Sequence, residues 1–331
     1  MTTAKAEDIR EFTLQDGPVR LSLLNLGAVT RGWWVPCGGA SVPVVLGYDD
    51  PARYLSDEAH LGGIAGRVAN RMTGGRLVLD GVHYQLSQNE GDTHLHGGAG
   101  GLNRRIWQAD ADSAGRRVRF TYHSPDGEEG YPGAVDFTVT ISLDGSAVTY
   151  DMRAEVDRPT PINLAQHNYY ALAGQAEIWD QRLTVQADRM TPLDRMQLPE
   201  GGIVALAGTR YDYQRGAILA DNDPQRRGSD ANLVLRDGLD RTAPVAELSA
   251  PNGLRMRMWS DQPDVQLYTA IHLAAQDGAH PGQRIAPFHG ICLEPQGYPD
   301  AMNQPEFPSI VVTPEAPYRQ VLTVDIAEQA P

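Results

Sequence analysis

The chain has 331 residues, a formal net charge of −14, and 34 glycines and 23 prolines, a composition that favours many turns over long helices. Its 28 basic residues include a single lysine, Lys5, which excludes enzymes that form a lysine Schiff base and proteins that bind nucleotides through a P-loop. The surplus of acidic residues argues against nucleic acid and anionic membranes as partners.

The sequence shows no pattern typical of a disulfide framework, a secretory signal or a membrane helix. Two cysteines, Cys37 and Cys292, are too few for a disulfide framework or a zinc site. The first residues lack the apolar core of a secretory signal, and no stretch approaches the roughly 18 apolar residues of a membrane helix. We therefore expect a cytoplasmic protein with no membrane partner. Since no linker or internal repeat is visible, we expect a single domain over residues 1–331.

The N-terminal half shows a periodicity of two residues, which is typical of strands. A first strand is expected at 19–24, and a hairpin at 77–86 has Asp80-Gly81 at its turn. Asp-Gly favours this turn because both of its central residues need positive φ. Helical periodicity is poor, and we expect short helical turns only near 49–54.

The clearest hairpin pairs 135–143 with 148–156, where apolar residues occupy every second position. Such alternation predicts one buried and one solvated face. A third hairpin surrounds Asn252-Gly253, and 221–230 is polar enough for a long surface loop. These patterns predict an all-β fold, a large antiparallel β-sandwich. Further strands are expected at 117–123, 182–188, 264–269, 309–313 and 320–326.

Two segments in the first third combine glycines with polar side chains. Residues 66–71 (GRVANR) could donate several hydrogen bonds to a polar ligand, or could form a solvated loop. In Thr93-His94-Leu95-His96, the two histidines would share one face of a strand and could bind a metal. No acidic residue follows to complete a metal triad, so a turn with one packed and one exposed histidine is the simpler interpretation.

Three later residues are candidates for proton transfer or ligand binding. His167 lies among Asn, Gln and Tyr residues, which can set its tautomer, although a lone histidine is often structural. Glu294 ends the apolar run 290–293, so a buried strand could tune its pKa, unless an ion pair holds it. Asp230 follows Gly228-Ser229, where an acid often caps a loop.

These motifs gain meaning from their order along the chain. In chain order the blocks are G-R-V-A-N-R, L-D-G-x-x-Y-x-L-x-x-N, H-L-H-G-G, P-x-N-L-x-x-H, V-Q-x-Y-T, C-L-E-P-Q and P-D-A-x-N-Q-P-x-F-P. Together they resemble the aldose 1-epimerase (galactose mutarotase) family, from about Gly27 to Val324. The resemblance implies a mutarotase-like supersandwich and an isomerase that interconverts the α- and β-anomers of a free aldose by acid/base ring opening and reclosure.

The resemblance also implies roles for individual residues. Glu294 would be the general base and His167 the general acid. It implies a monosaccharide substrate, no cofactor and no metal, in a monomer or homodimer. Two departures from the family pattern leave the preferred sugar open: Ala231 where a histidine is usual, and Ala270-Ile271 before His272 where Gly-Asn is usual. The sugar hydroxyls would be held by Asn70, Arg71, His96, Asp230 and Gln266.

Three alternatives stay open at this point. A non-catalytic carbohydrate-binding module would keep the hydroxyl-binding groups but could dispense with the Glu294–His167 pair. A glycosidase would use two carboxylates, such as Glu294 and Asp230. A metal enzyme would use His94 and His96. The absence of a G-x-S-x-G sequence argues against an α/β-hydrolase.

Overall fold

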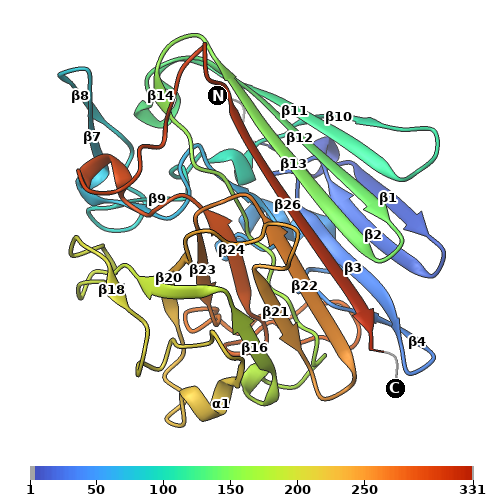
Figure 1. Ribbon diagram of the computed structural model, residues 1–331. Coiled ribbons are helices and arrows are strands. Elements are labelled where there is room, and N and C mark those ends of the chain that lie inside the picture. Colours follow the sequence, from blue (N-terminus) through green and yellow to red (C-terminus); the bar gives the residue numbers. More distant parts are fainter. Residues whose placement is uncertain (1–3, 330–331) are drawn as a thin grey trace.

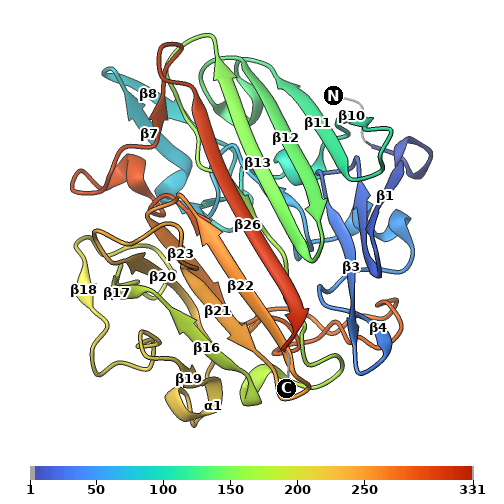
Figure 2. The ribbon, with the colours of Figure 1, turned by 45° about the vertical axis from the view of Figure 1, so that its right-hand side comes forward.

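The computed structural model describes residues 4–329, and its largest element is a nine-stranded antiparallel sheet that crosses the molecule (Figures 1 and 2). The C-terminal strand lies inside this sheet, between strands from the middle of the chain. In spatial order its strands are β10 (Gln108–Ala111), β11 (Arg117–Ser124), β12 (Val135–Asp144), β13 (Ala147–Val156), β26 (Tyr318–Glu328), β22 (Leu254–Ser260), β21 (Ala246–Ser249), β16 (Arg182–Val185) and β19 (Ala217–Ile218).

The β12–β13 hairpin forms as its alternation predicts. Asp144 pairs with Ala147 across a two-residue turn, and Gly145 adopts the positive φ that the turn requires. Every second side chain of β12 is buried, from Val135 to Leu143, while the residues between them are at least partly exposed. The buried side chains form one wall of the main core.

Two further sheets pack against the large one (Figure 2). Trp33 of the first sheet, Phe137 of β12 and Leu293 of the second belong to the same hydrophobic core, so all three sheets share it. The first sheet contains β1 (Glu11–Asp16), β2 (Val19–Leu24), β3 (Thr30–Cys37) and β4 (Ala40–Pro43). The second runs in the order β18 (Val204–Ala205), β17 (Ala187–Met190), β20 (Asp230–Leu235), β23 (Asp264–Tyr268) and β24 (Cys292–Gln296).

Short elements connect these sheets. The two-stranded pairs are β5 (Ile64–Ala65) with β15 (Ala165–Gln166), β6 (Arg71–Met72) with β9 (His94–Leu95), β7 (Arg76–Leu79) with β8 (Val82–Gln85), and β14 (Thr160–Pro161) with β25 (Val311–Val312). The helical turns are α1 (Leu219–Asn222) and the 3-10 turns at Ala6–Asp8, Pro51–Ser56, Thr73–Gly75, Leu102–Arg104, Glu128–Gly130, Ile178–Asp180 and Ala301–Asn303.

Most of the expected strands are present, and the all-β antiparallel fold is confirmed. The strand expected at 182–188 is wrong in one respect, because the chain passes from β16 to β17 and so changes sheets at Gln186. The loop expected at 221–230 is shorter, since α1 covers its start and Asp230 already begins β20. The strand expected at 309–313 is reduced to β25.

Within residues 4–329, no helix has the length and apolar character needed to cross a membrane.

Candidate active site

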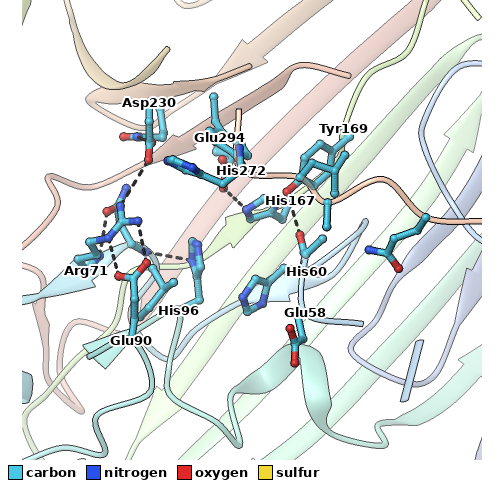
Figure 3. Close-up of a pocket in the computed structure, with 18 residues that line it drawn as sticks. Glu58, His60, Arg71, Glu90, His96, His167, Tyr169, Asp230, His272 and Glu294 are labelled. Carbon is cyan, nitrogen blue, oxygen red and sulfur yellow. Dashed lines mark hydrogen bonds and ion pairs between the residues drawn. The ribbon is translucent and has the colours of Figure 1, made fainter. Parts of the chain in front are cut away.

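A pocket of about 330 Å³ brings together all seven residues that the sequence singled out (Figure 3). They come from six separate segments of the chain, and several are nearly fully buried. The pocket is lined by these seven, Asn70, Arg71, His96, His167, Asp230, Gln266 and Glu294, and by Glu58, Ala59, His60, Glu90, Leu95, Tyr169, Tyr268, His272, Leu273, Ala274 and Gln276.

The floor of the pocket is one face of the sheet formed by β20, β23 and β24. Gln266 of β23 lies directly opposite Glu294 of β24, and Asp230 of β20 lies opposite Tyr268. Because side chains alternate along a strand, Asp230, Gln266 and Glu294 share this face. The other face sends Leu293 and its neighbours into the core. Glu294 is thus mid-strand and buried, not at a strand end as expected from the apolar run.

Glu294 of the pocket floor and His167 form a close pair. Their atoms Oε2 and Nε2 are 3.6 Å apart, and both side chains are buried. The backbone of His167 is held on both sides, since its N–H donates to the Gly63 carbonyl and its carbonyl accepts from the Gly62 N–H, each at 2.9 Å. A carboxyl and an imidazole in this position can move two protons on neighbouring atoms of one ligand.

Burial dominates the electrostatics of this pair. It raises the pKa of Glu294 well above the ordinary value, and the nearby charge of Asp230 adds to the rise. Burial also lowers the pKa of His167 to about 3, with His60 contributing repulsion. Although the two atoms are at ion-pair distance, both shifts favour neutral forms. Near neutral pH the pair therefore holds one proton between its two members.

Arg71 is fixed at the opposite side of the pocket by two carboxylates. Its guanidinium donates to Glu90 through Nε and NH2 at 2.6 and 2.9 Å, and NH1 lies 3.5 Å from Asp230. Gln266 Nε2 donates to the other oxygen of Asp230 at 2.5 Å. The bidentate contact with Glu90 fixes the plane of the guanidinium, which then presents its remaining donors in a defined direction.

Asn70 and His96 adopt strained left-handed backbone conformations, with φ of +64° and +52°. The Asn70 N–H donates to His96 Nδ1 at 3.1 Å, and the Asn70 side-chain oxygen accepts from the Arg71 N–H at 2.8 Å. Burial, together with the neighbouring His60 and His167, lowers the pKa of His96 well below its usual value. His96 is therefore neutral and can offer Nε2 to a hydroxyl.

Sequence reasoning missed several residues that line the pocket. His60 lies beside His96 and His167, with ring centroids 4.8 and 5.8 Å away, and burial lowers its pKa to about 4. Tyr169 packs on His167 at 5.1 Å, and its hydroxyl donates to the Ala59 carbonyl. His60 lies outside every motif, while the missed Glu90 falls next to the N that ends the second family block, which is the one signal that could have pointed to it.

The expectation that His94 and His96 share a strand face is wrong, because β9 ends at Leu95. His94 turns into the protein, where its Nε2 lies 2.6 Å from the Tyr131 hydroxyl, while His96 lines the pocket. Among residues 4–329, the group of at least three metal-capable side chains within reach of one another is His167, Cys292 and Glu294, and it includes neither His94 nor His96. Arg67, the other arginine of the GRVANR segment, is buried and donates to the Ser124 side chain and to the carbonyls of Pro132 and Gly133.

The two departures from the family pattern differ in position. Ala231 faces the hydrophobic core, so it does not contact the pocket. His272 is exposed and lines the pocket (Figure 3). Its backbone N–H donates to the Tyr268 hydroxyl, and its ring lies 6.4 Å from the Tyr268 ring. Of the two, His272 is therefore the one placed to affect ligand choice directly.

Comparison with known proteins places this architecture in context. The family model described as aldose 1-epimerase matches residues 10–325. Galactose mutarotase from Bos taurus is 36% identical over 95% of this chain and 92% of its own length. A structure of galactose 1-epimerase from Lactobacillus acidophilus NCFM has a TM-score of 0.84 at 27% identity, covering 97% of this chain and 95% of that one. An aldose epimerase homologue from C. elegans shares the fold with a TM-score of 0.91 at 24% identity, covering 97% and 100% of the two chains.

Proposed function

This chain belongs to the aldose 1-epimerase family, and from that premise we propose that Glu294 and His167 are the base and acid with which it interconverts the anomers of a free aldose. The enzyme is an isomerase, an aldose 1-epimerase. The observation that carries the assignment of residues is the 3.6 Å contact between Glu294 and His167 in the pocket. The two oxygens that exchange protons, O1 and the ring oxygen, are bonded to the same carbon, so acid and base must be neighbours.

In ring opening the sugar gives one proton to Glu294 and receives one from His167. Glu294 accepts the proton of the C1 hydroxyl while His167 Nε2 donates a proton to the ring oxygen. The C1–O5 bond breaks and the C1 carbonyl forms. After rotation about C1–C2, Glu294 returns its proton to O1, His167 accepts the proton of the C5 hydroxyl, and the C1–O5 bond re-forms on the other face. Each positioned group contributes roughly 10²–10⁴-fold to such a reaction.

Burial acts on the balance between the two states of this pair. Once Glu294 has accepted a proton and His167 has donated one, both groups are neutral, which is the state that burial favours. The same preference holds before the sugar reacts, so the charged state that starts ring opening, ionised Glu294 beside protonated His167, is the less stable arrangement of the one proton that the pair carries.

The rest of the pocket suits a neutral sugar. Arg71, Asp230 and Gln266 form a connected set of donors and acceptors, and Asn70 and His96 lie alongside them. We propose that these five bind the ring hydroxyls. Galactose is the first candidate, because curated relatives are named galactose mutarotases.

The alternatives are not favoured. A glycosidase needs two carboxyls on either side of a glycosidic bond, whereas the carboxyl of Glu294 lies against an imidazole. A binding module would have no use for a buried acid/base pair.

We also infer that the chain forms one domain, which is supported by a nine-stranded sheet that takes strands from residues 108 to 328. A cytoplasmic location is supported by the two free cysteines, since reduced thiols are usual there.

The central test replaces Glu294 with glutamine, which keeps the shape but cannot accept the proton. Pure α-galactose is dissolved with each protein, and the change of optical rotation is followed. We expect Glu294→Gln to lower kcat by at least about 10²-fold. The exposed Glu315→Gln is the matched control and should keep the full rate. Full activity of Glu294→Gln would show that another residue is the base.

A further inference from the structure

The thiol of Cys292 contacts the imidazole of the acid/base pair. Cys292 and Glu294 are two residues apart on β24, so both face the pocket side of the sheet. The Cys292 sulfur is 3.7 Å from His167 Nδ1, and Glu294 Oε2 is 3.6 Å from Nε2 of the same ring. The two nitrogens of His167 are thus matched to two side chains of one strand.

The ring of His167 has little freedom to turn away from these partners. Tyr169 packs on it at 5.1 Å and His96 meets it edge-on at 5.2 Å, while its backbone is hydrogen-bonded to Gly62 and Gly63. Both Cys292 and His167 are buried. The sulfur is therefore a fixed neighbour of Nδ1.

We propose that Cys292 is a positioning residue for the reaction: its sulfur accepts a hydrogen bond from Nδ1–H of His167, which leaves Nε2 as the nitrogen that exchanges protons with the sugar. The proposal rests on the proposed role of His167. A histidine that donates and accepts at Nε2 must keep its other proton on Nδ1 throughout, and the partner at Nδ1 decides which tautomer is present.

The choice of sulfur has a chemical consequence. Burial raises the pKa of the Cys292 thiol well above its ordinary value, so the sulfur stays neutral. A carboxylate at this position would stabilise the imidazolium and hold its proton more tightly. A thiol is a weak, uncharged acceptor that orients the ring without that effect. The imidazolium of His167 therefore remains a strong proton donor toward the ring oxygen.

The tautomer can be measured directly in the wild-type enzyme. We expect the ¹⁵N spectrum of histidine-labelled protein near neutral pH to show His167 as the Nδ1–H form, assigned by its loss in His167→Gln. In Cys292→Ala the Nε2–H form should gain population. A wild-type ring that carries its proton on Nε2 would overturn the proposal, whatever the variants do.

Kinetics provide the second readout. We expect Cys292→Ala to lower kcat about threefold to tenfold with KM unchanged, and Cys292→Ser, which keeps an acceptor of similar size, to lose less. The matched control is Cys37→Ala, which removes the other buried thiol, at the end of β3 and outside the pocket. An unchanged kcat and tautomer in Cys292→Ala would overturn the role of Cys292, while full activity of Glu294→Gln or His167→Gln would instead overturn the proposed function.

Discussion

At the scale of single residues, burial determines the protonation states of the ionisable side chains in the pocket. Glu294 is pushed toward its protonated form, and His60, His96 and His167 toward their neutral forms. Arg71 keeps its charge because Glu90 and Asp230 contact it. The pocket therefore has a neutral end, where protons move, and a charged end, where hydroxyls can be held.

The first prediction concerns the pH dependence of kcat. The reaction needs exactly one proton on the Glu294–His167 pair. A second proton is bound only as the pH falls toward the lowered pKa of His167, about 3, and the last proton leaves only above the raised pKa of Glu294. We expect kcat to stay constant from roughly pH 5 upward until the pH approaches the raised pKa of Glu294, measured by polarimetry with the uncatalysed rate subtracted. A narrow optimum between the ordinary values of about 4.3 for glutamate and 6.5 for histidine would contradict this.

A second residue-scale prediction concerns Glu90. Glutamine in its place can accept from Arg71 through one oxygen and without charge, so the guanidinium loses its fixed plane. We expect Glu90→Gln to raise KM for galactose about tenfold and to change kcat by less than about twofold, since Arg71 does not touch the reacting atoms. Glu58→Gln, on a glutamate of the same pocket away from Arg71, is the control (Figure 3). Equal effects of the two variants would argue against a specific role for Glu90.

At the scale of elements, the turn between β9 and Leu102 shapes one wall of the pocket. Gly97 has φ of +87°, and a Cβ there would lie 1.7 Å from the Gly66 carbonyl oxygen. Two of the sequence motifs, G-R-V-A-N-R and H-L-H-G-G, are thus in backbone contact. This contact explains why glycine is required beside His96.

We therefore expect Gly97→Ala to lower the free energy of unfolding by more than about 3 kcal/mol, because the backbone itself must move. Gly81→Ala is the matched control: its φ is +77°, but a Cβ there meets nothing within 4 Å. That change should cost only the backbone strain, about 1–2 kcal/mol. Urea unfolding of both variants gives the comparison. Similar losses of unfolding free energy would show that the close contact with Gly66 adds no cost to the substitution of Gly97.

The strands differ in how far the sequence predicts them. In β12 and β13 one face is solvated, so alternation gives their positions almost to the residue. β24 is buried on both faces, and no alternation is left to mark Glu294 as mid-strand. The family blocks contain six of the seven residues that meet in the pocket, all but Asp230, and they do not contain His60, which reaches the pocket from an irregular segment. Residues brought in by tertiary packing alone leave no local signal.

At the scale of the whole molecule, the C-terminal strand joins the two halves of the large sheet. The C-terminal β26 pairs with β13 on one side and with β22 on the other, so the large sheet is continuous only once the end of the chain is in place. The folded chain also buries an ionisable group away from the pocket. Asp264 of β23 is fully buried although it lies outside the pocket.

Asp264 makes the stability of the whole fold depend on pH. Asn232 donates to its Oδ2 at 2.9 Å, while Oδ1 has no hydrogen-bond partner among residues 4–329. Burial raises its pKa well above the ordinary value. The folded state thus binds a proton that the unfolded state has released above about pH 4, so this contribution to stability falls as the pH rises, until the folded pKa is reached.

We expect Asp264→Asn, which needs no such proton, to become more stable relative to wild type by about 1.4 kcal/mol for each pH unit between roughly pH 5 and the raised pKa. Urea unfolding of both proteins at several pH values measures the difference, and the exposed Asp277→Asn is the control substitution. If the Asp264→Asn difference did not change with pH, Asp264 would titrate alike in the folded and unfolded chain, which would contradict a pKa raised by burial.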